Sequence, residues 1–85
     1  MYRISKKVMS RTVDGEEVLL DLTGQVYFGL NSTGTRIWHF LQENRAPRVI
    51  AANLSEEFKV SPAQAYCDVM RLIQQLKERD LLADA

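Results

Sequence analysis

The chain contains one cysteine and one histidine, so it lacks most of the side chains from which catalytic and metal sites are built. Cys67 has no second cysteine for a disulfide and no adjacent basic residue that would favour a thiolate. His39 lacks the further histidines or clustered carboxylates that a metal site or a catalytic triad requires. Neither a glycine-rich phosphate loop nor a nucleophile elbow occurs. We therefore expect no enzyme activity, no metal and no cofactor.

Net charge and long apolar runs are also lacking. Eleven basic residues balance eleven acidic ones, whereas nucleic-acid binders normally carry excess positive charge, so we expect no nucleic-acid partner. No apolar run approaches the roughly 18 residues that span a bilayer, which excludes a membrane protein. The basic residues 1–7 are not followed by an apolar stretch of signal-peptide length, so the predicted location is the cytoplasm.

The first part of the sequence predicts three short strands. The 85 residues allow one domain, residues 1–85, with one small core. A loose alternation over residues 7–13 ends at Asp14-Gly15, a hairpin signal, so a second strand is expected over Val18–Leu22. The next residues, Asp21-Leu22-Thr23-Gly24, suit a type I turn. A third strand is expected over Gln25–Leu30.

The rest of the sequence predicts three helices. Asn31-Ser32 offers an N-cap to a helix that runs to about Glu43. Pro47 suits the first position of a second helix, although Ala46 gives that helix no side-chain cap. Ser61-Pro62-Ala63-Gln64 reads as a capping box, and the helix that it opens runs to about Asp80. These elements predict an α+β fold of the winged helix-turn-helix type, with an N-terminal three-stranded antiparallel sheet followed by three helices.

Two features predict a groove between the third strand and the last helix. The strand carries no charged residue from Gln25 to Leu30, and its Val26, Phe28 and Leu30 share the face that points to the core. The apolar residues of the last helix cover an arc of roughly 160°, which is wider than one contact needs. Its central residues Ala65, Val69, Leu72 and Leu76 would fill the core. The expected flank toward the strand comprises Tyr66, Met70 and Ile73, with Lys77 beyond them.

Three uses of this surface remain open at this point. An extended peptide could add to the exposed strand edge, with the groove supplying specificity. The same side chains could instead simply fill the core, or the edge could join two copies of the chain. DNA binding is a further alternative. In that case the residues that enter the major groove would be Gln64, Cys67 and Asp68, with Arg71 one turn further along the helix. Asp68 would repel phosphate, which disfavours that alternative.

Two segments, "VLLDLTGQVYFGLNSTGTRIW" and "VSPAQAYCDVMRLIQQLKERDLL", resemble the coenzyme PQQ synthesis protein D family, whose members recognise ribosomally made, modified peptides. The shared features are the strand that ends in Leu30-Asn31, the helix start Ser32-Thr33-Gly34, Asp68-Val69, and the terminal Leu81-Leu82. Asp21, Gly24, Tyr27 and Ile37-Trp38 look most like the stand-alone recognition proteins of lasso-peptide pathways. The chain departs from the family at Asn44-Arg45-Ala46, where a glycine and a better capping residue are expected.

The resemblance implies a partner and a set of contacts. The domain would hold the leader of a precursor peptide and present it to a separate leader peptidase, a transglutaminase-like cysteine protease, and would itself do no chemistry. An alternative is a peptide chaperone for a radical SAM enzyme or another modifying enzyme. Asp68 would either contact the leader or pair on the surface with Arg71 or Lys77. The residues implied to contact the leader are Gln25, Val26, Tyr27, Phe28, Gly29, Leu30, Tyr66, Met70, Ile73 and Lys77.

Overall fold

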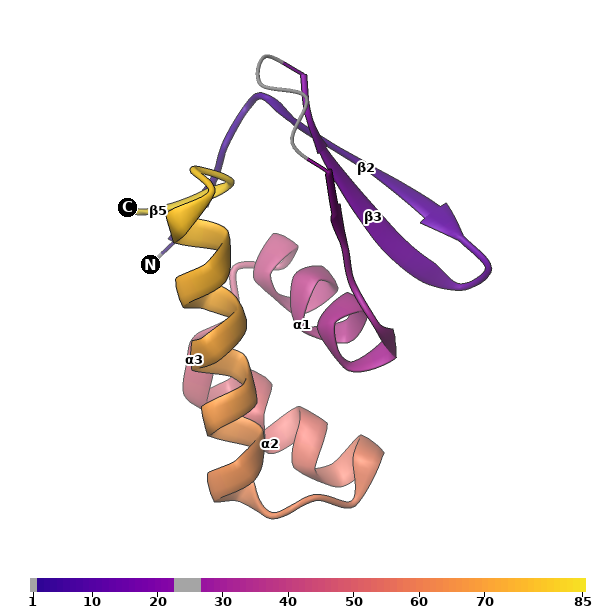
Figure 1. Ribbon diagram of the computed structural model, residues 1–85. Helices are drawn as coiled ribbons and strands as arrows, with labels where there is room; N and C mark the ends of the chain where they lie inside the picture. Colours follow the sequence, from indigo (N-terminus) through magenta and orange to yellow (C-terminus); the bar gives the residue numbers. More distant parts are fainter. Residues whose placement is uncertain (1, 23–26) are drawn as a thin grey trace.

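The structure, a computed structural model, describes residues 2–22 and 27–85, with Tyr27 described by its backbone. Two small sheets and three helices form an α+β fold, as the sequence predicts (Figure 1). The strands are β1 (Tyr2–Ile4), β2 (Val8–Val13), β3 (Glu16–Asp21), β4 (Tyr27–Gly29) and β5 (Leu82–Asp84). The helices are α1 (Ser32–Gln42), α2 (Pro47–Phe58) and α3 (Pro62–Glu78).

The main sheet has the order β2-β3-β4, and both pairs are antiparallel. The β2–β3 hairpin turns at Asp14 and Gly15, whose φ angles of 52° and 82° are those of the two-residue turn predicted from Asp-Gly. Strand β3 begins two residues before the predicted Val18 and ends before Leu22. Residues 23 and 24 of the predicted Asp21–Gly24 turn, and residues 25 and 26 of the third strand, lie outside the described residues.

The predicted helix starts are confirmed. The side chain of Asn31 accepts a hydrogen bond from the Gly34 N–H at 2.8 Å, and α2 begins at Pro47 without a side-chain cap. Ser61 Oγ accepts from the Gln64 N–H at 3.1 Å. The Gln64 side chain does not complete the expected capping box, because its amide donates to Asp68 Oδ1 at 2.9 Å instead. Gln64 thereby orients Asp68 on the surface of α3.

The core lies where the three helices meet the inner face of β3. Trp38 and Ile37 of α1, Ile50 and Leu54 of α2, and Leu19 of β3 are almost completely buried. Helix α3 adds the residues predicted for the core, and also Ile73, which is 2% exposed. These α3 residues are Ala65, Val69, Leu72, Ile73 and Leu76. The expectation that Ile73 lies on an open flank is therefore wrong.

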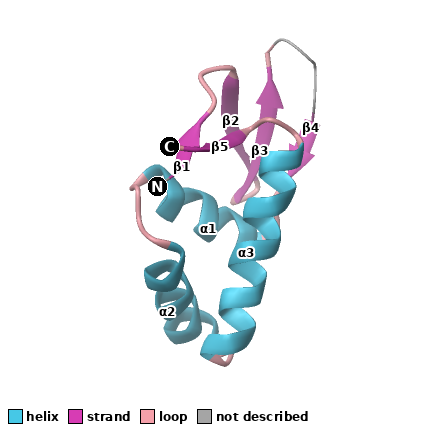
Figure 2. Ribbon diagram, turned by 90° about the vertical axis from the view of Figure 1, so that its left-hand side faces the viewer, coloured by secondary structure: helices cyan, strands magenta, loops and turns pink. Residues whose placement is uncertain are grey.

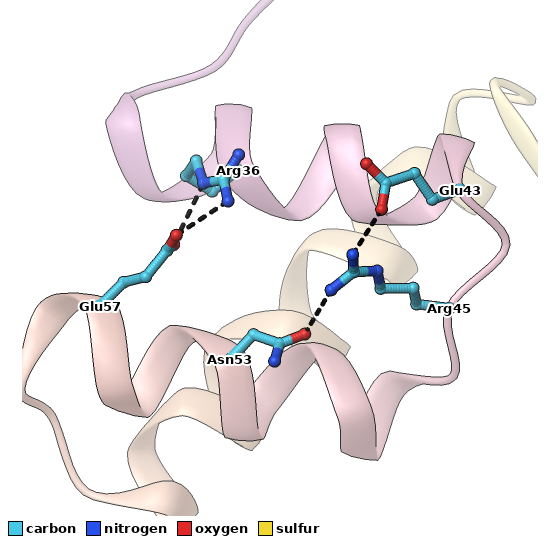
Figure 3. A network of polar contacts seen from close by, with 5 residues as sticks. All are labelled: Arg36, Glu43, Arg45, Asn53 and Glu57. Atoms are coloured by element: carbon cyan, nitrogen blue, oxygen red, sulfur yellow. Dashed lines mark hydrogen bonds and ion pairs between the residues drawn. The ribbon is translucent and has the colours of Figure 1, made fainter.

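Helices α1 and α2 are joined by a polar network on their outer surface (Figure 3). Arg36 of α1 forms an ion pair with Glu57 of α2 at 2.8 Å, and the resulting hydrogen bonds raise the pKa of Arg36 and lower the pKa of Glu57. Arg45, in the connection, bonds Glu43 at 2.7 Å and Asn53 of α2 at 2.8 Å. The guanidinium groups of Arg36 and Arg45 each lie 4.5 Å from the centre of the Phe40 ring. The network orients α2 against α1.

The second sheet, β1–β5, has no counterpart in the sequence prediction. It pairs Tyr2 with Asp84 and Ile4 with Leu82, so it joins segments from opposite ends of the sequence. Lys77 of α3 binds this sheet, because its ammonium lies 3.1 Å from Asp84 Oδ1 and 5.7 Å from the centre of the Tyr2 ring. The C-terminal end of α3 is thus held by both strands.

Candidate peptide-binding site

Strand β4 lies at one edge of the main sheet. Leu30, just after the strand, donates its N–H to the Glu17 carbonyl at 2.9 Å, so Leu30 and Phe28 are the residues that bond to β3. In an antiparallel ladder the alternate residues direct their N–H and C=O groups the other way. Tyr27 and Gly29 therefore present their backbone groups to the outer side of β4, beside which α3 runs (Figures 1 and 2).

A pocket of about 280 Å³ lies between β4, the start of α1 and α3. Its apolar wall consists of Phe28 with Leu30, Ile37 and Leu72, of which the last three are at most 7% exposed. Its polar residues are Asn31 and Thr33 at the start of α1, and Asp68, Arg71 and Gln75 on α3. An apolar side chain could enter this pocket while the backbone that carries it pairs with β4.

Local contacts hold this site in shape. Gly34 sits at the start of α1 where a Cβ atom would come within 3.3 Å of both the Asn31 and Leu30 side chains. Glu17 of β3 is buried, and its N–H donates to Thr35 Oγ1 of α1 at 2.9 Å. Its carboxylate accepts a hydrogen bond from Thr12 and lies 3.5 Å from His39 Nε2. These contacts fix α1 against β3, and with it the inner wall of the pocket.

The charges of the site are arranged along α3. Asp68 accepts from Gln64 and lies 3.8 Å from Arg71 Nη1, so its charge already has two partners. One turn beyond Gln75, the Arg79 guanidinium lies over the Phe28 ring, 4.8 Å from its centre. The surface pairing of Asp68 with Arg71 that the sequence allowed is therefore present.

The α3 residues that face β4 differ from those expected. At about 100° per residue, Asp68, Arg71 and Gln75 of α3 and the C-cap residue Arg79 fall within roughly 80° of one another, and we call them the groove flank. Tyr66, Met70 and Lys77, the far flank, fall within roughly 40° on the opposite side of the helix. The far flank meets other neighbours: Lys77 contacts the β1–β5 sheet, and Met70 packs against the core. The predicted placement of these three residues and Ile73 beside the strand is wrong.

Of the expected strand residues, Phe28, Gly29 and Leu30 line the pocket. Tyr27 contributes its outward backbone, whereas Gln25 and Val26 lie outside the described residues. The pocket residues Gln75, Ile37 and Arg71, and also Arg79, were not predicted from the sequence as part of the site. The four-residue spacing of Arg71, Gln75 and Arg79 is visible in the sequence, but polar residues at that spacing are typical of any solvated helix face.

A larger hollow of about 770 Å³ lies between α2 and α3. Tyr66, which is 40% exposed, lines it together with Arg48, Ala52 and Ser55. Its walls are helical, so it offers no unpaired strand backbone to an extended peptide. The smaller pocket beside β4 combines one apolar wall with a sheet edge, and we regard it as the candidate site.

Neither metal-binding nor membrane-spanning features occur in the described part of the chain. Within residues 2–22 and 27–85, His, Cys, Asp and Glu side chains form no group of three that could hold a metal ion. No helix in these same ranges has the length and apolar content needed to cross a bilayer.

Comparison with known proteins links this architecture to peptide recognition. Residues 16–82 match the family model of coenzyme PQQ synthesis protein D. A solved structure of TbiB1 in complex with the TbiA(beta) leader peptide is 35% identical, with a TM-score of 0.87 over 94% of this chain and 93% of that one. A lasso peptide synthetase B1 complexed with its leader peptide is 28% identical, with a TM-score of 0.91 over 98% of both chains. No curated protein sequence matches significantly.

Proposed function

The chain belongs to the coenzyme PQQ synthesis protein D family, and from this premise we propose that it binds the leader segment of a ribosomally made precursor peptide. In this proposal the leader adds as an antiparallel strand to β4. Both solved relatives were captured with a leader peptide, and one of them is a lasso peptide synthetase B1. A lasso-peptide precursor is therefore the partner best supported.

The observation that carries the proposal is the combination of an edge strand with a pocket beside it. The outward N–H and C=O groups of Tyr27 and Gly29 suit main-chain pairing with any extended peptide, so they supply affinity without sequence preference. The pocket formed with Leu30, Ile37 and Leu72 suits one apolar leader side chain, which supplies specificity.

The proposal assigns the chain a role in presentation and not in catalysis. The bound leader would be handed to a separate leader peptidase of the transglutaminase-like cysteine protease type, in the cytoplasm where precursors are synthesised. A peptide held as a strand is extended, and extended segments are the form that proteases cleave.

Titration with a synthetic leader tests the proposal. Two peptides serve as probes: the leader of this pathway's own precursor, and the TbiA(beta) leader that the 35%-identical relative binds. Binding is measured by fluorescence anisotropy. We expect the cognate leader to bind saturably, with a dissociation constant of about tens of micromolar or below. A peptide of the same composition in scrambled order is the control. Equal binding of both sequences, or of neither, would contradict the proposed function.

The strand edge itself is tested by a pair of proline variants. Gly29→Pro removes an outward N–H and places a ring against the incoming strand, whereas the β3–β4 hydrogen bonds are kept. A Cβ atom added at Gly29 meets nothing within 4 Å, and the preceding Phe28 is in a strand, the conformation that a following proline favours. Ser10→Pro is the matched control on β2, because the Leu22-to-Lys7 hydrogen bond makes Ser10 an outward residue of the opposite edge.

We expect Gly29→Pro to weaken leader binding by about tenfold or more, since it removes a main-chain hydrogen bond and adds a steric conflict. Ser10→Pro should leave the affinity unchanged. Circular dichroism and thermal unfolding verify that both variants fold. The opposite pattern, with loss of binding on Ser10→Pro alone, would assign the leader to β2.

A further inference from the structure

Arg79, at the polar end of the groove, has no anionic partner among the described residues. The Arg79 side chain is exposed, and its guanidinium lies 4.8 Å from the centre of the Phe28 ring. Across residues 2–22 and 27–85, no carboxylate forms an ion pair with Arg79. The other groove-flank cation, Arg71, already has Asp68 at 3.8 Å. The two arginines therefore differ in their capacity to bind a new anion.

Stacking on Phe28 affects how this guanidinium can be used. An arginine that lies on an aromatic face keeps its N–H edges available, and a carboxylate can accept two parallel hydrogen bonds from such an edge. A peptide strand beside Phe28 would also remove water from the guanidinium. That loss is offset if the peptide carries an anion there, and is made worse if it carries a cation.

The relative direction of β4 and α3 determines which part of a bound peptide lies beside Arg79. Strand β4 and α3 run in opposite directions (Figures 1 and 2). A peptide antiparallel to β4 therefore runs parallel to α3, so its earlier residues lie beside Asp68 and Leu72 and its later residues lie beside Arg79. Leu72 and Arg79 are seven residues apart, which is about 10 Å along a helix.

An extended strand covers about 10 Å in three residues, and side chains on one face recur every two residues. Resting on the proposed function, we propose that Arg79 selects leaders with an aspartate or glutamate two or four positions C-terminal to the apolar residue that enters the pocket. Phe28 is the positioning residue that holds the guanidinium at this level. Arg79 is thus a specificity determinant for acidic leaders.

The test uses a positional series of synthetic peptides based on the cognate leader and on the TbiA(beta) leader. The apolar anchor is identified first, as the residue whose replacement by alanine costs the most affinity. Glutamate, glutamine and lysine are then placed at each of the following four positions. The quantity measured is the ratio of dissociation constants between peptides in one protein preparation, so a variant's folded fraction cancels.

We expect wild-type protein to prefer glutamate over glutamine by roughly three- to tenfold at the second or fourth position, and to disfavour lysine there. Arg79→Gln should abolish this preference, and Arg79→Glu should invert it in favour of lysine. Arg48→Gln, which removes an exposed arginine beside the α2–α3 hollow, should leave it intact. High salt should reduce the preference.

Two outcomes would overturn the inference while the proposed function stands: saturable leader binding without a glutamate preference, or a preference that survives in Arg79→Gln. Failure of every leader to bind wild-type protein would instead reject the proposed function and this inference with it. The Arg79→Glu variant gives the decisive result, because a merely structural role of Arg79 would not make lysine the favoured leader residue.

Discussion

The two flanks of α3 differ in what lies beside them. On the far flank, Lys77 binds Asp84 of β5, Met70 packs against the core, and Tyr66 lines the hollow next to α2. The groove flank faces a pocket whose opposite wall is β4. The far flank thus meets segments of the same chain, whereas the groove flank borders a strand edge.

This difference shows that apolar content alone does not identify the binding side of a helix. The far flank has the larger apolar side chains, Tyr66 and Met70, while the groove flank consists of Asp68, Arg71, Gln75 and Arg79. The apolar part of the groove comes from Leu72, which borders the groove flank, and from residues of β4 and α1. A peptide site here is a pocket with one apolar wall and with polar and charged residues of α3 along another.

The largest expected effect concerns Ile73, which lies in the core beside the far flank. Ile73→Ala should lower the free energy of unfolding by about 2–5 kcal/mol, because it leaves a cavity at a residue that is 2% exposed. Urea denaturation measures the change. A decrease in the free energy of unfolding well below 1 kcal/mol would contradict the burial of Ile73 and favour the exposed flank position expected from the sequence.

The next effect separates the groove flank from the rest of α3. Gln75→Trp should fill the pocket and weaken leader binding about tenfold, or about 1.4 kcal/mol, measured by fluorescence anisotropy. Gln74→Trp is the matched control, because Gln74 is an exposed glutamine one position earlier that does not line the pocket.

Tyr66→Ala extends this test to the far flank and should leave the affinity within about twofold, because Tyr66 lines the α2–α3 hollow and not the pocket. If Tyr66→Ala weakens binding and Gln75→Trp does not, the two flanks have been assigned the wrong way round.

The elements of the fold that depend on local signals could be predicted from the sequence. Asp14-Gly15, Asn31, Pro47 and Ser61 each act within a few residues, through a turn conformation or an N-cap, and each lies where the sequence indicated. The β1–β5 sheet could not be predicted, because each strand has three residues and its partner is at the other end of the chain.

The candidate site could be predicted in part, for a geometric reason. The uncharged strand was identified, and its Phe28, Gly29 and Leu30 line the pocket. A helical periodicity, however, gives only the width and centre of the buried arc of α3. Which edge of that arc faces β4 depends on how the sheet packs across the helices, and no local residue encodes this. The sequence pattern predicted Tyr66, Met70 and Lys77 beside β4, whereas they lie on the opposite edge.

The smallest expected effect concerns the Arg36–Glu57 pair, which lies away from both flanks. The pKa of Glu57 is lowered by its hydrogen bonds to Arg36, so the pair stabilises the fold above the ordinary glutamate pKa, and this contribution disappears as the pH falls through the lowered value. Glu57→Gln should cost less than about 1 kcal/mol at pH 7, because side chains 39% and 40% exposed are screened by water.

Thermal unfolding at several pH values measures this effect: the deficit of Glu57→Gln should begin to shrink near the ordinary glutamate pKa of about 4.3 and vanish below the lowered pKa of Glu57. Glu56→Gln, at the neighbouring exposed glutamate, is the control and should show no such trend. A deficit that is independent of pH would show that the ion pair is not its source.

Amide hydrogen exchange, followed by NMR with and without saturating leader peptide, tests the central claim most directly. The claim is that the leader pairs with the outer edge of β4. Exchange of the Tyr27 and Gly29 amides should slow by about tenfold or more when the leader is bound, while the outward Ser10 amide on β2 should be unaffected. Saturable binding that leaves the Tyr27 and Gly29 amides unprotected, or that protects Ser10 instead, would contradict the account.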